Sequence, residues 1–155
     1  MNHSIGFSLQ MARDWCLDVL SDCPHELTDV LANPFRNTIR WQAGHMLTVA
    51  ERMLFRYPDD DQNFLPISFS EWFESGTSPD NWTHQPPTLE ELVSLLKEQQ
   101  ERISLISPEQ FEVRQEPLHY GFASLGQCAG FVVVHEAFHV GKITEMIRVI
   151  KQQHL

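Results

Sequence analysis

Two histidines four residues apart are the first feature of this sequence that could do chemistry. They lie in His135-Glu136-Ala137-Phe138-His139, which matches the H-E-x-x-H pattern of zinc proteases, where both histidines bind zinc and the glutamate activates water. On a helix, residues i and i+4 share one face, so both imidazoles can reach a common point. The pair therefore indicates either a metal site or two core histidines that hydrogen bonds satisfy.

A zinc protease needs a third ligand after this pattern, and the sequence does not offer one. In one branch the motif continues with a glycine and a third histidine, where this chain has Lys142 and Glu145. In the other branch a glutamate from a following helix completes the site, but few residues follow His139. Glu145 lies less than two turns further along the same helix, too close to fold back. The sequence therefore argues against a protease.

A third ligand would then come from an earlier segment. His45 lies on the flank of an apolar helical face, and His119 lies just before the last expected helix. Spacing alone leaves both histidines open as candidates. Gly44, beside His45, would allow a ligand or another backbone to approach closely, or would serve a packing contact.

Four segments with the periodicity of amphipathic helices must position these histidines. We expect helices over residues 4–21, 38–56, 88–106 and 124–152, and no segment reads convincingly as a strand. Asn37 is a candidate N-cap of the second helix. Capping boxes beginning at Thr88 and Ser124 open the third and the fourth, and Ser107 could start one short additional turn. The fold class is therefore all-α, a four-helix bundle in one domain over residues 1–155.

The last of these helices places both histidines on its core-facing stripe, at 100° per residue. The other members of the stripe are Cys128, Phe131, Val132, Ile143, Met146 and Ile150. Cys128 is two turns from His135, roughly 10 Å, so we expect a core thiol there rather than a third ligand.

The segment 57–87 between the second and third helices has no helical pattern. It contains the aromatic residues Phe64, Phe69, Trp72, Phe73 and Trp82, which favour packing over disorder. We expect a long loop that drapes over one end of the domain.

Composition and charge exclude several classes of function. Of the 155 residues, 42% are apolar and 21% charged, and the net charge is −10, which disfavours a nucleic-acid partner. No apolar run approaches the ~20 residues that span a bilayer, and the N-terminus lacks the apolar core of a signal peptide. Three cysteines without a paired spacing fit a reducing compartment, with buried thiols at Cys16 and Cys128. We therefore expect a cytoplasmic protein with no membrane partner.

The segments NTIRWQAGHMLTVAER (37–52) and HEAFHVGKI (135–143) resemble those of the DinB-like (DinB/YfiT-like) family of metalloenzymes. Members carry Gly-His in the second helix and commonly H-E-x-x-H-x-G-Q-I in the last. Matching positions are Gly44, His45, His135, His139, Gly141 and Ile143, whereas Lys142 replaces the commoner glutamine. The resemblance covers the whole chain in helix order. It implies a four-helix bundle that forms a homodimer, with one divalent metal held by His45, His135 and His139 rather than by His119.

The resemblance also implies a chemistry. Related enzymes transfer low-molecular-weight thiols such as bacillithiol or mycothiol. Three imidazoles leave a coordination position open, zinc or nickel suits them, and a bound cation deprotonates a thiol. We therefore expect a metal-dependent thiol S-transferase that joins a small thiol to an electrophilic small-molecule substrate. A metal-dependent hydrolase is less favoured, and the alternative of another class is a non-catalytic, metal-stabilised bundle acting in a stress response or in binding.

Two further residues are weak candidates for catalysis. Glu136 has the place of the protease general base, but it lies about 100° from His135 around the helix, which favours a supporting or surface role. Tyr120 precedes the last helix, and together with His119, Trp72 and Trp82 it could line a pocket.

Overall fold

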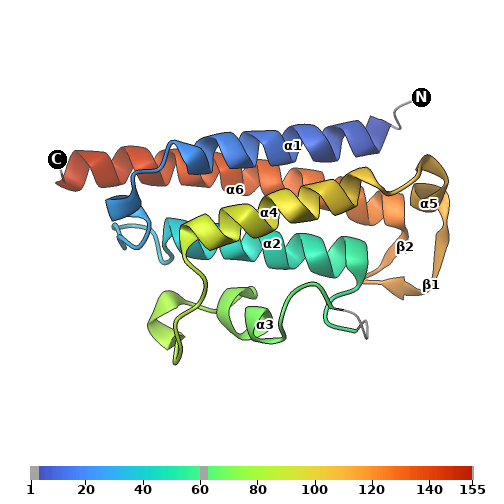
Figure 1. Cartoon of the computed structure of the whole chain (residues 1–155), viewed down its shortest axis with the longest axis horizontal. Coiled ribbons are helices and arrows are strands. Elements are labelled where there is room, and N and C mark those ends of the chain that lie inside the picture. The colour runs from blue at the N-terminus through green and yellow to red at the C-terminus, as the bar shows by residue number, and fades with distance from the viewer. Residues whose placement is uncertain (1–3, 60–62, 155) are drawn as a thin grey trace.

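Four long helices form the fold in the computed structural model, which describes residues 4–59 and 63–154. They are α1 (Ser4–Ser21), α2 (Ile39–Phe55), α4 (Leu89–Ser104) and α6 (Leu125–His154). Helices α1 and α2 each pack against both α4 and α6. As Figure 1 shows, α1 and α6 run in one direction and α2 and α4 in the other. The expected all-α bundle is confirmed.

The helices begin where the sequence offers capping side chains. At α4 the expected capping box forms: the Glu91 N–H donates to Thr88 Oγ1 at 3.2 Å, and the Thr88 N–H donates to the Glu91 carboxylate at 2.7 Å. At α2 the expected N-cap, Asn37, is wrong. Thr38 has that role, because its hydroxyl oxygen accepts the Trp41 N–H at 3.2 Å.

The start of α6 departs from the expected capping box in one bond. Ser124 Oγ accepts the Gln127 N–H at 3.2 Å, as the box requires, but the Gln127 side chain accepts the N–H of Ala123 instead of that of Ser124. Ser124 belongs to a strand that leads directly into α6, so the chain enters the helix from an extended conformation.

A small β-hairpin, which the sequence did not lead us to expect, precedes α6. The short helix α5 (Pro108–Glu112) has Ser107 as its N-cap, as expected. Strand β1 (Arg114–His119) then pairs antiparallel with β2 (Phe122–Ser124). Tyr120 and Gly121 form the turn with φ of 52° and 83°, the left-handed values that tight hairpin turns need. The hairpin therefore places Tyr120 at its tip.

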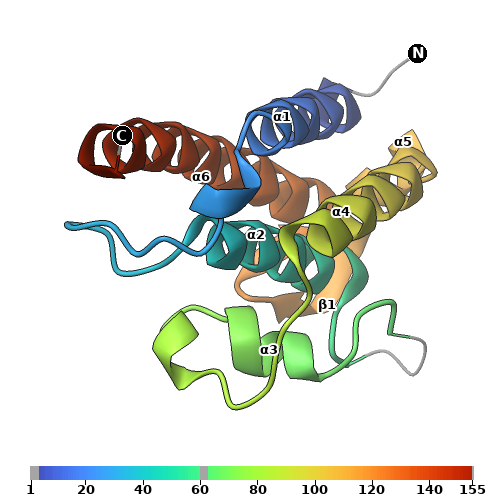
Figure 2. The ribbon, with the colours of Figure 1, turned by 60° about the vertical axis from the view of Figure 1, so that its left-hand side comes forward.

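The connection between α2 and α4 is long because both helices begin at the same end of the bundle. It contains α3 (Ser68–Phe73) and a 3-10 turn, η2 (Pro79–Asn81), and residues 60–62 within it lie outside the described residues. Figures 1 and 2 show it running beside α2, on the side away from α1. The expected drape over one end is therefore replaced by a cover along the side of α2. Phe69 and Phe73 are buried against the core, so the expected aromatic packing is confirmed.

The core is divided into two apolar clusters with a polar layer between them. One cluster includes Leu20, Met46 and Ile143, and the other includes Leu9 and Val132. Between them lie buried polar side chains from all four long helices: Arg13, Gln42, His45, Thr48, Glu51, Gln99, Glu136 and His139. This polar layer is where functional side chains are found. No helix in the described part of the chain is both long and apolar enough to cross a membrane.

Candidate metal centre

Three histidines from two helices meet where α6 packs on α2. One ring nitrogen of each of His45, His135 and His139 lies within 4.8 Å of the other two. Nε2 of His135 is 3.2 Å from Nε2 of His45 and 3.1 Å from Nε2 of His139. In a tetrahedral site with metal–nitrogen bonds of 2.0–2.1 Å, two ligand nitrogens would lie about 3.3–3.4 Å apart. The observed spacing therefore suits a single metal ion.

The ring of His45 is fixed from two sides. Its Nδ1–H donates to the carbonyl oxygen of Phe73 at 2.6 Å, and the Trp41 ring stacks on it at 4.6 Å with an interplanar angle of 12°. With its proton on Nδ1, the imidazole directs its Nε2 lone pair toward the other two histidines. The aromatic segment that follows α2 thus serves the site through a backbone atom.

Gly44 makes this contact with Phe73 possible. A Cβ at position 44 would collide with the ring atoms of Phe73, so α3 can approach α2 closely only where the helix carries glycine. Of the two expected roles for Gly44, close ligand approach or packing, the structure shows packing.

Gln42 holds His139 in the same way as Phe73 holds His45. The Nδ1–H of His139 donates to Gln42 Oε1 at 2.5 Å, and Gln42 is fully buried. Sequence reasoning missed Gln42, although its place one turn before His45 on α2 was a usable signal. The two helices that carry the histidines therefore also orient them.

His135 is the least constrained member of the cluster. It is half-buried, whereas His45 and His139 are each 6% exposed. Its Nδ1 is buried without a hydrogen-bond partner among the described residues. Its Nε2 faces two lone pairs, so a proton or a cation is needed between the three nitrogens. This donor set fits a metal ion.

Burial keeps the cluster in its neutral, metal-binding form at neutral pH. Burial first, and the neighbouring histidines second, lower the pKa of His135 to about 4 and that of His139 to about 3. Burial also lowers the pKa of His45, opposed in part by the bond to Phe73. Neutral imidazole is the state that ligates metals.

Glu136 is buried in the core, not placed at the surface, and it contacts α1 rather than α2. Its carboxylate forms an ion pair with Arg13, and the two side chains are 2% and 1% exposed. Arg13 also donates to the Leu96 carbonyl and to Gln99, each at 2.8 Å. The 100° offset from His135 therefore points Glu136 at a different helix. Of the two expected roles, supporting or surface, the surface role is wrong, and Glu136 supports the position of α6 through Arg13.

Gln99 extends this contact to α2. Its amide nitrogen donates to Glu51 Oε2 at 2.7 Å and to the Leu47 carbonyl at 3.1 Å, and Arg102 pairs with Glu51 at 2.8 Å. The network connects all four long helices at the level of the histidines. Arg13 and Gln99 were not singled out from the sequence, because a buried arginine on α1 is only understood once its partner is known.

His119 and Tyr120 belong to the hairpin rather than to the histidine cluster. Nε2 of His119 lies 2.8 Å from the carbonyl oxygen of Arg52. The Tyr120 hydroxyl accepts from Arg52 Nη1 at 2.9 Å, and the side chain is 62% exposed. Arg52 also pairs with Glu74. Trp72 and Trp82 pack around Phe73 and so support the cluster indirectly.

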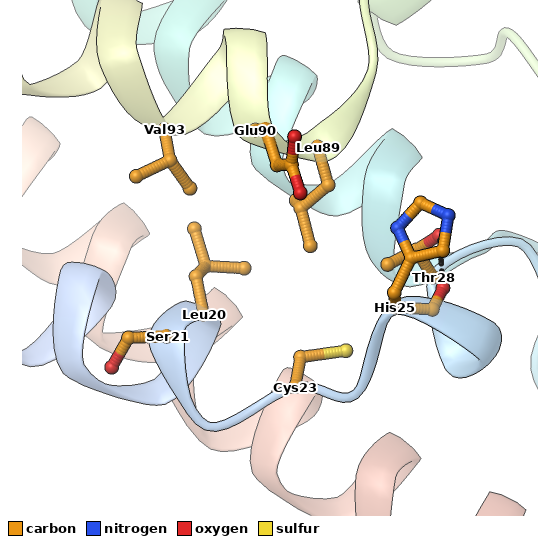
Figure 3. A pocket seen from close by; sticks show the side chains of 8 residues that line it. All are labelled: Leu20, Ser21, Cys23, His25, Thr28, Leu89, Glu90 and Val93. Atoms are coloured by element: carbon orange, nitrogen blue, oxygen red, sulfur yellow. Dashed lines mark hydrogen bonds between the residues drawn. The ribbon is translucent and has the colours of Figure 1, made fainter.

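A separate cavity lies between the end of α1 and the start of α4. It has a volume of about 280 Å³, and its lining includes Leu20, Cys23, Leu89 and Val93 (Figure 3). Burial raises the pKa of the Cys23 thiol to about 11, so the thiol is protonated at neutral pH and is a poor nucleophile. None of the three clustered histidines lines this cavity.

Comparison with known proteins agrees with the geometry. A model of the DinB superfamily matches residues 8–143. The chain belongs to the DinB superfamily. A search of curated proteins found no significant match. In this DinB-superfamily chain the matched region includes α2 and the part of α6 that carries His135 and His139.

Proposed function

We propose that this DinB-superfamily chain is a metal-dependent enzyme that joins a low-molecular-weight thiol to an electrophilic substrate. His45, His135 and His139 would hold one divalent ion, zinc or nickel by ligand preference. The observation that carries the proposal is the convergence of three imidazole Nε2 atoms from α2 and α6, with no cysteine or carboxylate joining them among the described residues. Such a donor set leaves a coordination position open for a reactant.

The residues around the three histidines would orient the ligands and keep water away from the metal, and they would not transfer protons. Gln42 and the Phe73 carbonyl keep the Nδ1 atoms of His139 and His45 protonated, so that both Nε2 atoms remain available as donors. Trp41 and Phe73 close the site on the α2 side. The bound ion would lower the pKa of an incoming thiol and so supply a thiolate nucleophile at neutral pH.

Metal content measured by elemental mass spectrometry is the first test. We expect about one ion per chain in the wild type, and loss of the ion in His45→Ala, His135→Ala and His139→Ala, because each removes one of three ligands. His119→Ala is the matched control and should keep the ion. Retention in any of the three variants would contradict the ligand set, and an apo wild type after reconstitution would contradict the metal site.

Thiol transfer needs a separate test on the metal-loaded protein. Incubation with bacillithiol and an activated aryl halide should yield the thioether faster than in the metal-free protein, and His135→Ala should remove the difference. A protein that binds metal and gains stability from it, yet neither binds nor transfers thiols, would instead support the non-catalytic bundle.

A further inference from the structure

His135, the most exposed histidine of the cluster, lies on a flank of α6 that it forms with Phe131, Phe138 and Lys142. At 100° per residue, the other three residues lie within about 60° of His135 around the helix. His135 is the half-buried member of the cluster, and Phe131 and Phe138 are 38% and 66% exposed. A molecule that approaches the cluster at His135 would therefore meet this α6 flank.

The two phenylalanines give the α6 flank an apolar surface in contact with the histidines themselves. The Phe131 ring stacks on His135 at 5.5 Å with an angle of 27°, and the Phe138 ring meets His139 edge-on at 5.3 Å. Neither ring is buried by the fold. Their exposed faces can stack with a planar group of a ligand, and little free energy is lost in removing water from these apolar rings.

Lys142 adds a positive charge that has no counter-charge paired with it in the described part of the chain. It is half-buried one turn beyond His139, and it forms no ion pair or hydrogen bond within residues 4–59 and 63–154. At 100° per residue it lies about 20° from His135 around α6 and so is on the same side of the helix as the cluster. The nearby carboxylate of Glu74 pairs with Arg52. In a chain with a net charge of −10, a lone cation beside the site favours an anionic ligand.

We propose that the α6 flank selects a thiol with a planar apolar body and one carboxylate. Phe131 and Phe138 would contact the planar body, and the Lys142 ammonium would pair with the carboxylate. This inference rests on the proposed function, because the sulfur of that thiol would occupy the coordination position that the three histidines leave open on the metal. Lys142 acts here as a residue that determines specificity, while the histidines remain the ligands.

Cobalt-loaded protein provides a readout of thiol binding that does not depend on catalysis. Thiolate ligation produces a charge-transfer band, which can be titrated with 4-mercaptobenzoate and with its neutral methyl ester. We expect the wild type to bind the acid roughly five-fold more tightly, as a partly exposed ion pair allows. Lys142→Gln should remove the preference and Lys142→Glu should reverse it, whereas Lys151→Gln, an exposed lysine further along α6, should leave it unchanged.

A separate variant tests the contact between the phenylalanine rings and the planar body of the thiol. Phe138→Ala should weaken binding of the acid and of the ester equally, by roughly two- to ten-fold. Leu105→Ala, at an exposed apolar residue after α4, should weaken binding of neither. Cobalt content of each variant shows that the site is still formed.

The outcomes separate this inference from the proposed function. Equal affinity of the wild type for acid and ester, with the charge-transfer band present, would overturn the role of Lys142 and leave the thiol site standing. Absence of the band with both thiols in cobalt-loaded protein would overturn the thiol function and this inference with it.

Discussion

Gly44 shows how one residue sets the geometry of the cluster. A methyl group there would collide with the Phe73 ring, and the Phe73 carbonyl holds His45. We expect Gly44→Ala to destabilise the protein by about 1–3 kcal/mol, as overpacking does, and to weaken metal binding because Phe73 is displaced. Urea unfolding and metal titration measure the two effects.

Gly141 is the matched control for this prediction. It is also a glycine inside a long helix, but a Cβ there meets nothing within 4 Å. Gly141→Ala should therefore stabilise the protein by up to about 1 kcal/mol through helix propensity and leave metal affinity unchanged. Equal effects of the two substitutions would show that the packing of Phe73 on α2 does not matter.

The lowered pKa values of His135 and His139, about 4 and about 3, make the metal-free protein sensitive to acid. Below pH 6.5 these histidines take up protons in the unfolded chain but not in the folded one, so stability falls as the pH drops toward 4. Each contributes a slope of up to about 1.4 kcal/mol per pH unit. Urea unfolding at pH 7, 6 and 5 should show this slope. A His135→Gln/His139→Gln variant should lose it, and an unchanged slope in that variant would contradict the prediction.

At the scale of the elements, the Arg13–Glu136 pair fixes the position of α6 against α1 and α4. Glu136→Gln would leave the buried Arg13 without its counter-charge, so we expect a loss of about 3–5 kcal/mol in unfolding free energy. Replacing both residues, as Arg13→Met/Glu136→Leu, should recover most of that loss. If Glu136→Gln kept full stability but lost thiol transfer, Glu136 would be acting as a general base after all.

Much of the helical frame could be predicted because its signals are local. The capping box at Thr88 and the apolar period of α4 depend on neighbours within a few residues, and the predicted start of that helix is confirmed. The hairpin was missed because its strands are short and bury only Gln115, so they carry no alternation of apolar residues. A Tyr-Gly pair at the turn was the one cue.

The site was less predictable because its geometry depends on contacts between distant segments. Periodicity placed His135 and His139 on a common stripe, but it left His45 on the flank of its helix, and the family resemblance was needed to prefer it over His119. For Glu136 the choice between a supporting and a surface role stayed open. A bundle helix has several buried neighbours, and a helical wheel shows only its main apolar face. The roles of Gln42 and Phe73 follow from tertiary contacts alone.

At the scale of the whole molecule, homodimerisation and cytoplasmic location stay predictions. Helix α1 offers a face for a second copy: Phe7, Met11 and Trp15, four residues apart, are all exposed. We expect sedimentation velocity to show a dimer for the wild type and a monomer for Trp15→Glu. Leu105→Glu, at another exposed apolar residue, is the control and should remain dimeric. A monomeric wild type would contradict the prediction.

The placement of the three free cysteines bears on their reactivity toward alkylating agents. Cys16 and Cys128 are buried, and burial raises the pKa of Cys16 to about 12, of Cys23 to about 11, and that of Cys128 as well. Alkylating agents react with thiolates, so the chain offers them almost none of its own. We therefore expect alkylating agents to modify the folded chain slowly at neutral pH and faster once it is unfolded, as mass spectrometry would show.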